Sequence, residues 1–199
     1  MTVHNIIDKS CKIQNRSMLI DTNVLLFYFY DKVNYLGEGG EVSRIKEYSS
    51  FLGRLLDEKV AMYTHKISIS EFVNEIYMTE LKLLYVDKKG SLQGNRIPER
   101  KKFVRENLDK DKIIRNNLLT YIDKVRKHFV LIDGIDDLET LLANSVQGWL
   151  ASRAEMADSI MIAEAKEMKI EAILSDDSDM VSFAGFNLYT ANPRSLPKR

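Results

Sequence analysis

The stretch that decides the fold is SMLIDTNVLLFYFY, residues 17–30. A short apolar run leads straight into the carboxylate of Asp21, and apolar residues resume three positions later. Such a run is typical of a short buried strand, and Thr22 or Asn23 is expected to cap a helix that continues to about Asp31. An acid between two segments that both favour burial either caps this helix or lies at the edge of a sheet with a chemical role.

The same alternation of short apolar runs and helical segments continues along the chain. Strands are predicted at residues 60–64, 129–132, 172–174 and 187–190, and helices at residues 41–59, 68–85, 99–127, 136–147 and 153–168. Residues 1–16 are expected to be a polar lead-in, and residues 37–40 a loop that lacks the Gly-Lys-Ser/Thr ending of a phosphate-binding loop. Short apolar strands separated by helices predict an α/β fold, a three-layer α/β/α sandwich around a mostly parallel sheet.

The composition is that of a single globular domain, residues 1–199. A chain with 45% hydrophobic residues can bury one substantial core, and its formal net charge of +0 argues against a general polyanion binder. The single cysteine, Cys11, excludes an internal disulfide and fits a reducing compartment. No apolar run has the length of a membrane span, and the first residues are too polar for a signal peptide. A cytoplasmic protein is therefore expected.

Asp158 is the acid whose surroundings are most informative. In a continuous helix its neighbours one and two turns away are Ala154, Met161, Ile162 and Ala165, so the carboxylate lies on an apolar face. A buried carboxylate without a partner is costly, and no Lys or Arg occupies this face within one turn. Either a neighbouring segment satisfies the carboxylate or a metal ion does.

The other acids follow predicted strands or begin predicted helices. Asp21 and the turn Ser175–Asp179 both come directly after strands, so they share the edge where the carboxyl ends of parallel strands meet. The turn holds three carboxylates in four positions, which repel one another unless a divalent cation binds them. Glu71 opens a predicted helix, where the helix dipole alone favours an acid, and Glu75 lies one turn further on. Each acid has a structural explanation, but their joint placement favours a site for Mg²⁺ or Mn²⁺.

Four stretches resemble the motifs of the PIN-domain ribonucleases, whose fold is used by the toxin nucleases of bacterial and archaeal toxin–antitoxin pairs. The stretches are LIDTNVL at residues 19–25, ISEF at 69–72, ADSIMIA at 157–163 and LSDDSDM at 174–180. In order and type they are similar to the family's Asp, Glu, Asp and Thr/Ser-x-Asp-x-Asp acids. The stretch between the second and third motifs is longer than in compact family members, so residues 86–128 are expected to be a helical insertion.

The resemblance implies a role for individual residues. The acids that bind metal and carry catalysis would be Asp21, Glu71, Asp158, Asp177 and Asp179. Asp179 would complete the set of ligands or orient a water molecule, and Ser175 and Asn23 would support the ligands from behind. Asp176 falls on the variable position of the last motif, and Met180 stands where the family usually has an aromatic residue. Whether Asp176 or Glu75 replaces one of the assigned acids stays open.

The activity that the resemblance implies is hydrolysis of RNA phosphodiester bonds by a metal-dependent endoribonuclease with one or two Mg²⁺ or Mn²⁺ ions. No Ser-His or Cys-His nucleophile pair is suggested, and His4, His65 and His128 lack the spacing of a zinc site, so water is the expected nucleophile. An antitoxin partner and a homodimer are further implications. A homodimer also agrees with early helices whose aromatic residues exceed what one sheet face covers: Tyr48, Phe51, Phe72 and Tyr77.

An acidic site repels RNA, so basic residues are needed to hold the strand. They are dense in the expected insertion, at Arg96, Arg100, Lys101, Lys102, Arg105, Lys110, Lys112 and Arg115. Nearby acids such as Glu106 and Asp109 dilute this charge, so a solvated helix face and an RNA contact are both open readings of the segment.

Three other functions compete with a ribonuclease. A haloacid-dehalogenase-like phosphatase needs a second Asp two residues after the first, where this chain has Asn23, and is rejected. A structure-selective DNA nuclease of the flap type, and a non-catalytic interaction module with the same fold, both stay open. Whether the chain is a toxin or an RNA-processing enzyme is not decided by the sequence.

Overall fold

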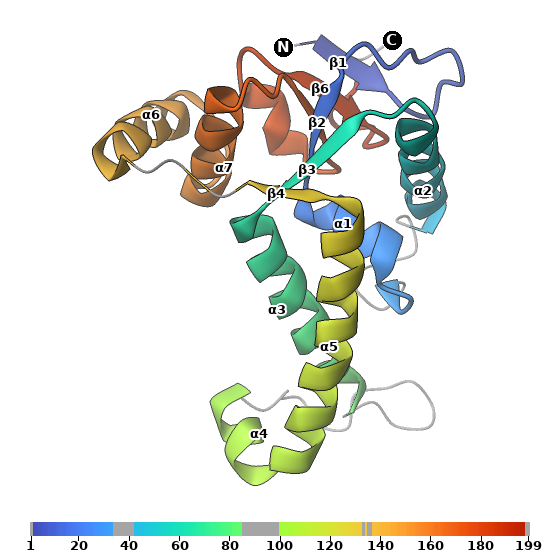
Figure 1. Cartoon of the computed structure of the whole chain (residues 1–199), viewed down its shortest axis with the longest axis vertical. Coiled ribbons are helices and arrows are strands. Elements are labelled where there is room, and N and C mark those ends of the chain that lie inside the picture. The colour runs from blue at the N-terminus through green and yellow to red at the C-terminus, as the bar shows by residue number, and fades with distance from the viewer. Residues whose placement is uncertain (1, 34–41, 85–99, 133, 135–136, 198–199) are drawn as a thin grey trace.

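The computed structural model describes residues 2–33, 42–84, 100–132, 134 and 137–197. Within these ranges six strands form one sheet in the order β1-β6-β5-β2-β3-β4, and all neighbouring strands are parallel (Figure 1). The strands are β1 (Thr2–Asn5), β2 (Ser17–Ile20), β3 (Ala61–His65), β4 (Val130–Ile132), β5 (Ala172–Leu174) and β6 (Asn187–Thr190).

Helices connect the strands and cover the sheet. They are α1 (Thr22–Phe29), α2 (Val42–Asp57), α3 (Lys66–Leu83), α4 (Arg100–Glu106), α5 (Leu108–His128), α6 (Leu138–Ala151), α7 (Met156–Glu167) and the short 3₁₀ helix η2 (Ser178–Ser182). None of the helices in the described ranges is both long and apolar enough to cross a membrane.

Apolar side chains project from both faces of the sheet, and each face packs in a separate hydrophobic core. Met18 and Ile20 of β2 pack on one side with α1, α2, α3 and α5. Leu19, which lies between them, packs on the other side with Met161 of α7 and with Phe186. This is the alternation that a strand imposes on successive side chains. Helices on both faces of a parallel sheet confirm the expected α/β fold, and it is the fold that the resemblance to PIN-domain ribonucleases implies (Figure 1).

The expectation of an irregular lead-in at residues 1–16 is wrong at its start. Residues Thr2–Asn5 form β1, which pairs with β6 in the register Thr2↔Asn187, and the ring of His4 stacks on Tyr189 with centroids 4.4 Å apart. A four-residue edge strand with half-exposed polar side chains carries no apolar run that could be recognised. Its partner also lies at the distant carboxyl-terminal part of the chain.

The starts of α3 and α7 differ from the predicted ones, whereas the sequence prediction of Asp136 or Asp137 near the cap of α6 is confirmed for Asp137. The imidazole of His65 accepts a hydrogen bond from the N–H of Ile67, and α3 therefore begins at Lys66 rather than at residue 68. Asp137 caps α6 by accepting from the N–H of Glu139. Helix α7 begins at Met156, three residues after the predicted start.

The middle of the chain is anchored to the sheet domain through α5. Ile114, Leu118 and Val125 of this helix are buried in the same core as β2. Figure 1 shows α4 and the first turns of α5 at the end of α3 that is remote from the sheet. The proposed insertion at residues 86–128 remains a prediction, because residues 85–99 lie outside the described part of the chain; the expected loop at 37–40 also lies outside it.

The aromatic residues that were taken to favour a homodimer are fully enclosed within the chain. Tyr48, Phe51, Phe72 and Tyr77 are each at most 1% exposed and belong to one core with α1 and β2. Helices α1 and α5 together cover more apolar surface than one sheet face alone would. These four residues therefore leave no aromatic surface for a second copy.

Candidate active site

Asp21 is the buried centre of the site. It follows β2 as the N-cap of α1: its Oδ1 accepts a 2.7 Å hydrogen bond from the N–H of Thr22, and its Oδ2 accepts a 2.6 Å bond from the hydroxyl of Ser175. The prediction that Thr22 or Asn23 caps this helix is therefore wrong, and the other expectation, that the Asp21 carboxylate itself caps it, is confirmed. Only 5% of Asp21 is exposed.

The burial of Asp21 raises the pKa of its carboxyl to about 7. Loss of hydration on burial is the largest cause, because it disfavours the charged form. The bonds from Ser175 and Thr22 lower the pKa, whereas the nearby charges of Asp158 and Asp177 raise it further. Three carboxylates from different segments therefore lie within electrostatic reach of one another.

The turn after β5 supplies the second part of the site. The hydroxyl of Ser175 accepts from the N–H of Asp177 at 3.0 Å while it donates to Asp21, so one side chain joins the two acids. Asp177 then caps η2, with its Oδ1 accepting from the N–H of Asp179 at 2.8 Å. This chain of bonds fixes the direction in which the turn leaves the sheet.

Asp158 lies half-buried in the first turn of α7. Its Oδ2 accepts a 3.0 Å bond from the backbone N–H of Glu155. Burial, followed by the charges of Asp177, Glu71 and Glu155, raises the pKa of Asp158 to about 6, although the bond from Glu155 lowers it. The expectation of an acid in the middle of an apolar helix face is corrected here, because the later helix start gives Asp158 a backbone partner and leaves Ala154 outside the helix.

Glu71 reaches the site through Thr22, a contact that the sequence argument missed. The Thr22 hydroxyl donates a 2.7 Å hydrogen bond to Oε2 of Glu71. Since α3 starts at Lys66, Glu71 lies in the second turn, and the helix-dipole explanation for this acid no longer applies. Glu71 and its rival Glu75 on the next turn are both exposed, and it is Glu71 that accepts the bond from Thr22. A threonine directly after a strand-ending Asp was the only signal for this contact.

Asp176 faces away from the other acids. Its carboxylate binds Arg44 Nη1 at 2.5 Å and the Tyr48 hydroxyl at 2.9 Å, both from α2. Its backbone carbonyl accepts from Asn192 Nδ2. With two partners on its side chain, Asp176 anchors the turn against α2, which leaves Asp177 as the acid of this pair that faces Asp21 and Asp158.

A buried His–Glu pair lies beside the acids and was not anticipated. His65 ends β3, and its Nε2 contacts Oε2 of Glu164 on α7; both side chains are at most 1% exposed. Nδ1 accepts from Ile67, and burial lowers the pKa of His65, so the ring is neutral with its proton on Nε2. The pair therefore connects the start of α3, the helix of Glu71, to α7, the helix of Asp158.

The donors suit a hard divalent cation in kind, because every candidate ligand is a carboxylate oxygen. Burial is the largest cause of the raised pKa at Asp21 and at Asp158, and neighbouring carboxylates, Asp177 at both, raise it further; a bound cation would offset this negative charge. Among the described residues, however, no three His, Cys, Asp or Glu side chains are arranged closely enough to hold a metal as they stand. Asn23 is exposed in the first turn of α1, and Asp179 is exposed on η2.

Comparisons with known proteins give structural similarity only. No protein-family model matches the chain. No curated protein matches it in sequence. Among solved structures, a crystal structure of FitAcB from Neisseria gonorrhoeae is similar with 17% identity and a TM-score of 0.47, over 90% of this chain and 99% of that chain. A structure of FitAB bound to the IR36 DNA fragment has 16% identity and a TM-score of 0.41, over 92% of this chain and 98% of that chain. Similarity at this level does not assign the chain to a family.

Proposed function

We propose that the chain is a Mg²⁺- or Mn²⁺-dependent ribonuclease that hydrolyses phosphodiester bonds in RNA. One observation carries the proposal: Asp21, Glu71, Asp158 and Asp177 come from four separate segments, yet they lie within electrostatic reach at one edge of the sheet. The carboxyl ends of parallel strands are where α/β proteins place their ligands. Strongly raised carboxyl pKa values in such a place are typical of functional sites.

In this proposal the four acids, with Asp179 beside them, hold one or two divalent cations. A bound ion of this kind stabilises negative charge on a phosphoryl oxygen and lowers the pKa of water. The other residues of the site keep the ligands in position. Ser175 holds Asp21 and Asp177 together, and Thr22 holds Glu71. Asn23, exposed beside Asp21, is proposed to orient a water molecule.

We also propose that the biological role is that of a toxin nuclease with an antitoxin partner. The support is the resemblance of the four motifs, all of whose acids are present. We further propose that the chain forms a homodimer and that it acts in the cytoplasm. Expression of the chain alone is expected to stop growth, with rescue by a neighbouring gene, whereas an RNA-processing enzyme would leave growth unchanged.

The deciding experiment is cleavage of single-stranded RNA by the purified chain with Mg²⁺ or Mn²⁺. Wild type is expected to cut, EDTA to abolish cutting, and Asp158→Asn to reduce it by orders of magnitude. Cleavage that persists in EDTA would refute the metal mechanism. A DNA substrate with a flap, assayed in parallel, tests the alternative of a structure-selective DNA nuclease. If neither substrate is cut, a non-catalytic interaction module is favoured.

A further inference from the structure

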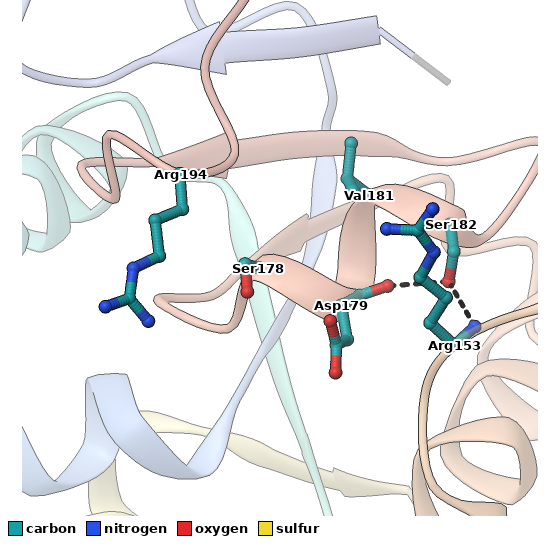
Figure 2. A pocket seen from close by; sticks show the side chains of 6 residues that line it. All are labelled: Arg153, Ser178, Asp179, Val181, Ser182 and Arg194. Carbon is teal, nitrogen blue, oxygen red and sulfur yellow. Dashed lines mark hydrogen bonds between the residues drawn. The ribbon is translucent and has the colours of Figure 1, made fainter.

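A hollow beside the acids carries positive charge on both sides. It is lined by Arg153, Ser178, Asp179, Val181, Ser182 and Arg194 and encloses about 430 Å³. Figure 2 shows the Arg153 and Arg194 side chains on opposite sides of Ser178 and Asp179. Asp179 thus belongs both to the proposed metal-binding turn and to the wall of this hollow.

The backbones of both arginines are tied to the turn that carries the acids. The N–H of Arg153 donates to the hydroxyl of Ser182, which in turn donates to the carbonyl of Asp179 (Figure 2). The N–H of Arg194 donates to Oδ1 of Asn192, whose Nδ2 donates to the carbonyl of Asp176. The backbone of each arginine is therefore held in place relative to the turn that carries Asp177 and Asp179.

The guanidinium groups themselves remain available. Arg153 and Arg194 are exposed, and neither is in an ion pair within the described ranges. Arg44, by contrast, is occupied by Asp176, and Arg115 by Asp111. An unpaired guanidinium presents a planar set of donors that matches the oxygens of a phosphate.

We propose that Arg153 and Arg194 bind backbone phosphates of the polynucleotide strand next to the scissile bond. The inference rests on the proposed function and names the residues that hold its substrate. A chain with a net charge of +0 and an acidic site has no general attraction for a polyanion, so local cations must offset the acids. The two arginines supply such charge at the site, whereas α4, which carries Lys101 and Arg105, lies at the end of α3 remote from the sheet (Figure 1).

The test measures binding rather than cleavage, in the Asp158→Asn background with EDTA. The anisotropy of a labelled single-stranded RNA is followed against salt concentration for Arg153→Ala/Arg194→Ala. Loss of two phosphate contacts is expected to make the slope of log K against log salt shallower by about 1.4, since each contact in a single strand contributes roughly 0.7. Affinity at low salt is expected to fall at least tenfold.

Two matched variants complete the design. Lys12→Ala/Arg16→Ala removes the same charge from two exposed residues that precede the amino end of β2, whereas the acids follow the carboxyl ends of the strands. This control is expected to keep the slope of the parent protein. Arg153→Lys/Arg194→Lys keeps the charge and is expected to restore most of the slope. Single-stranded DNA of the same sequence should show the same change in slope, because the phosphate is common to both strands.

The outcomes separate this inference from the proposed function. A slope unchanged by Arg153→Ala/Arg194→Ala, an equal change in the Lys12/Arg16 control, or a change on RNA but not on DNA would overturn the phosphate assignment, even if wild type cuts RNA. A slope change specific to the two arginines supports the assignment, even if wild type cuts nothing.

Discussion

The hydroxyl of Ser175 donates a 2.6 Å hydrogen bond to Oδ2 of Asp21, although 154 positions separate the two residues. The same oxygen accepts from the N–H of Asp177, so it contacts two acids that come from different strand ends. The serine therefore stabilises the ionised form of Asp21, because hydrogen bonds to a carboxylate favour its charge.

Ser175→Ala is expected to reduce RNA cleavage at pH 7 by roughly 10- to 150-fold, because a hydrogen bond to a charged group contributes roughly 1.5–3 kcal/mol. The pKa of Asp21 should rise, so the pH profile of cleavage should move to higher pH. The measurement is the cleavage rate between pH 5.5 and 9. Ser50→Ala, on the exposed surface of α2, is the control, and a wild-type profile for Ser175→Ala would contradict the assigned role.

Replacement of the neighbouring acids Asp176 and Asp177 by asparagine is expected to change the melting temperature in opposite directions. Asp177 adds repulsion to Asp21 and Asp158, so Asp177→Asn should raise the melting temperature in EDTA. Asp176 is paired with Arg44 and Tyr48, so Asp176→Asn should lower it. Differences of about 1–2 kcal/mol correspond to roughly 2–8 °C in a chain of this length. Scanning calorimetry in EDTA provides the comparison, and equal signs for the two variants would contradict the geometry.

Asp158→Asn tests the same repulsion at the helix. The amide oxygen of the new side chain can still accept from Glu155, so the cap is kept while the charge is lost. The melting temperature in EDTA should rise by about 3 °C, cleavage should fall by orders of magnitude, and the stabilisation by added Mn²⁺ should weaken. A lower melting temperature together with retained cleavage would refute the assignment of this residue.

The stability of the metal-free protein is expected to fall as the pH rises from about 4 to 7. Asp21 and Asp158 have folded-state pKa values of about 7 and about 6, above the ordinary value of 3.8, so the folded chain binds more protons than the unfolded chain in this window. His65, with its lowered pKa, acts in the opposite direction. The contribution of Asp21 to this pH dependence is therefore measured as the difference in free energy of unfolding between Asp21→Asn and wild type. If that difference does not grow between pH 5 and 7.5, the raised pKa of Asp21 is refuted.

The buried contact between His65 and Glu164 is expected to be costly to break. Glu164→Ala leaves the neutral Nε2–H of His65 without an acceptor, and a buried unpaired donor costs about 1–3 kcal/mol. Glu164→Gln should cost less, since its amide oxygen can accept the same proton. Urea unfolding measures both, with Glu167→Ala at the exposed end of α7 as the control. Equal stability of the Glu164→Ala and Glu167→Ala proteins would contradict this prediction.

The sequence predicted the central sheet well because its strands are continuous apolar runs. β2 and β5 were placed at their observed positions, and the motif acids that follow them lie together at one edge of the sheet. β1 was missed because it lies at the sheet edge, where half-exposed polar side chains are tolerated. Strand pairing over such a distance leaves no local pattern.

The finer geometry of the site depended on side-chain bonds that no spacing reveals. The His65 cap moved the start of α3 and thereby changed the meaning of Glu71. The pair formed by Arg44 and Asp176 separates two adjacent acids that look equivalent in the sequence. The first is a local bond from a side chain to the backbone two residues on, and the second joins side chains 132 positions apart. Neither belongs to a periodic pattern.

The position of β6 between β1 and β5 has a consequence for synthesis on the ribosome. β1 emerges first, yet it cannot join the sheet until β6, whose Asn187 pairs with Thr2, has left the exit tunnel. Asp21 likewise waits for Ser175, which closes its hydrogen bond. At elongation rates of roughly 5–20 residues per second, the acids stay apart for many seconds. A growing chain therefore carries no assembled acid cluster until Ser175 and Asp177 have emerged.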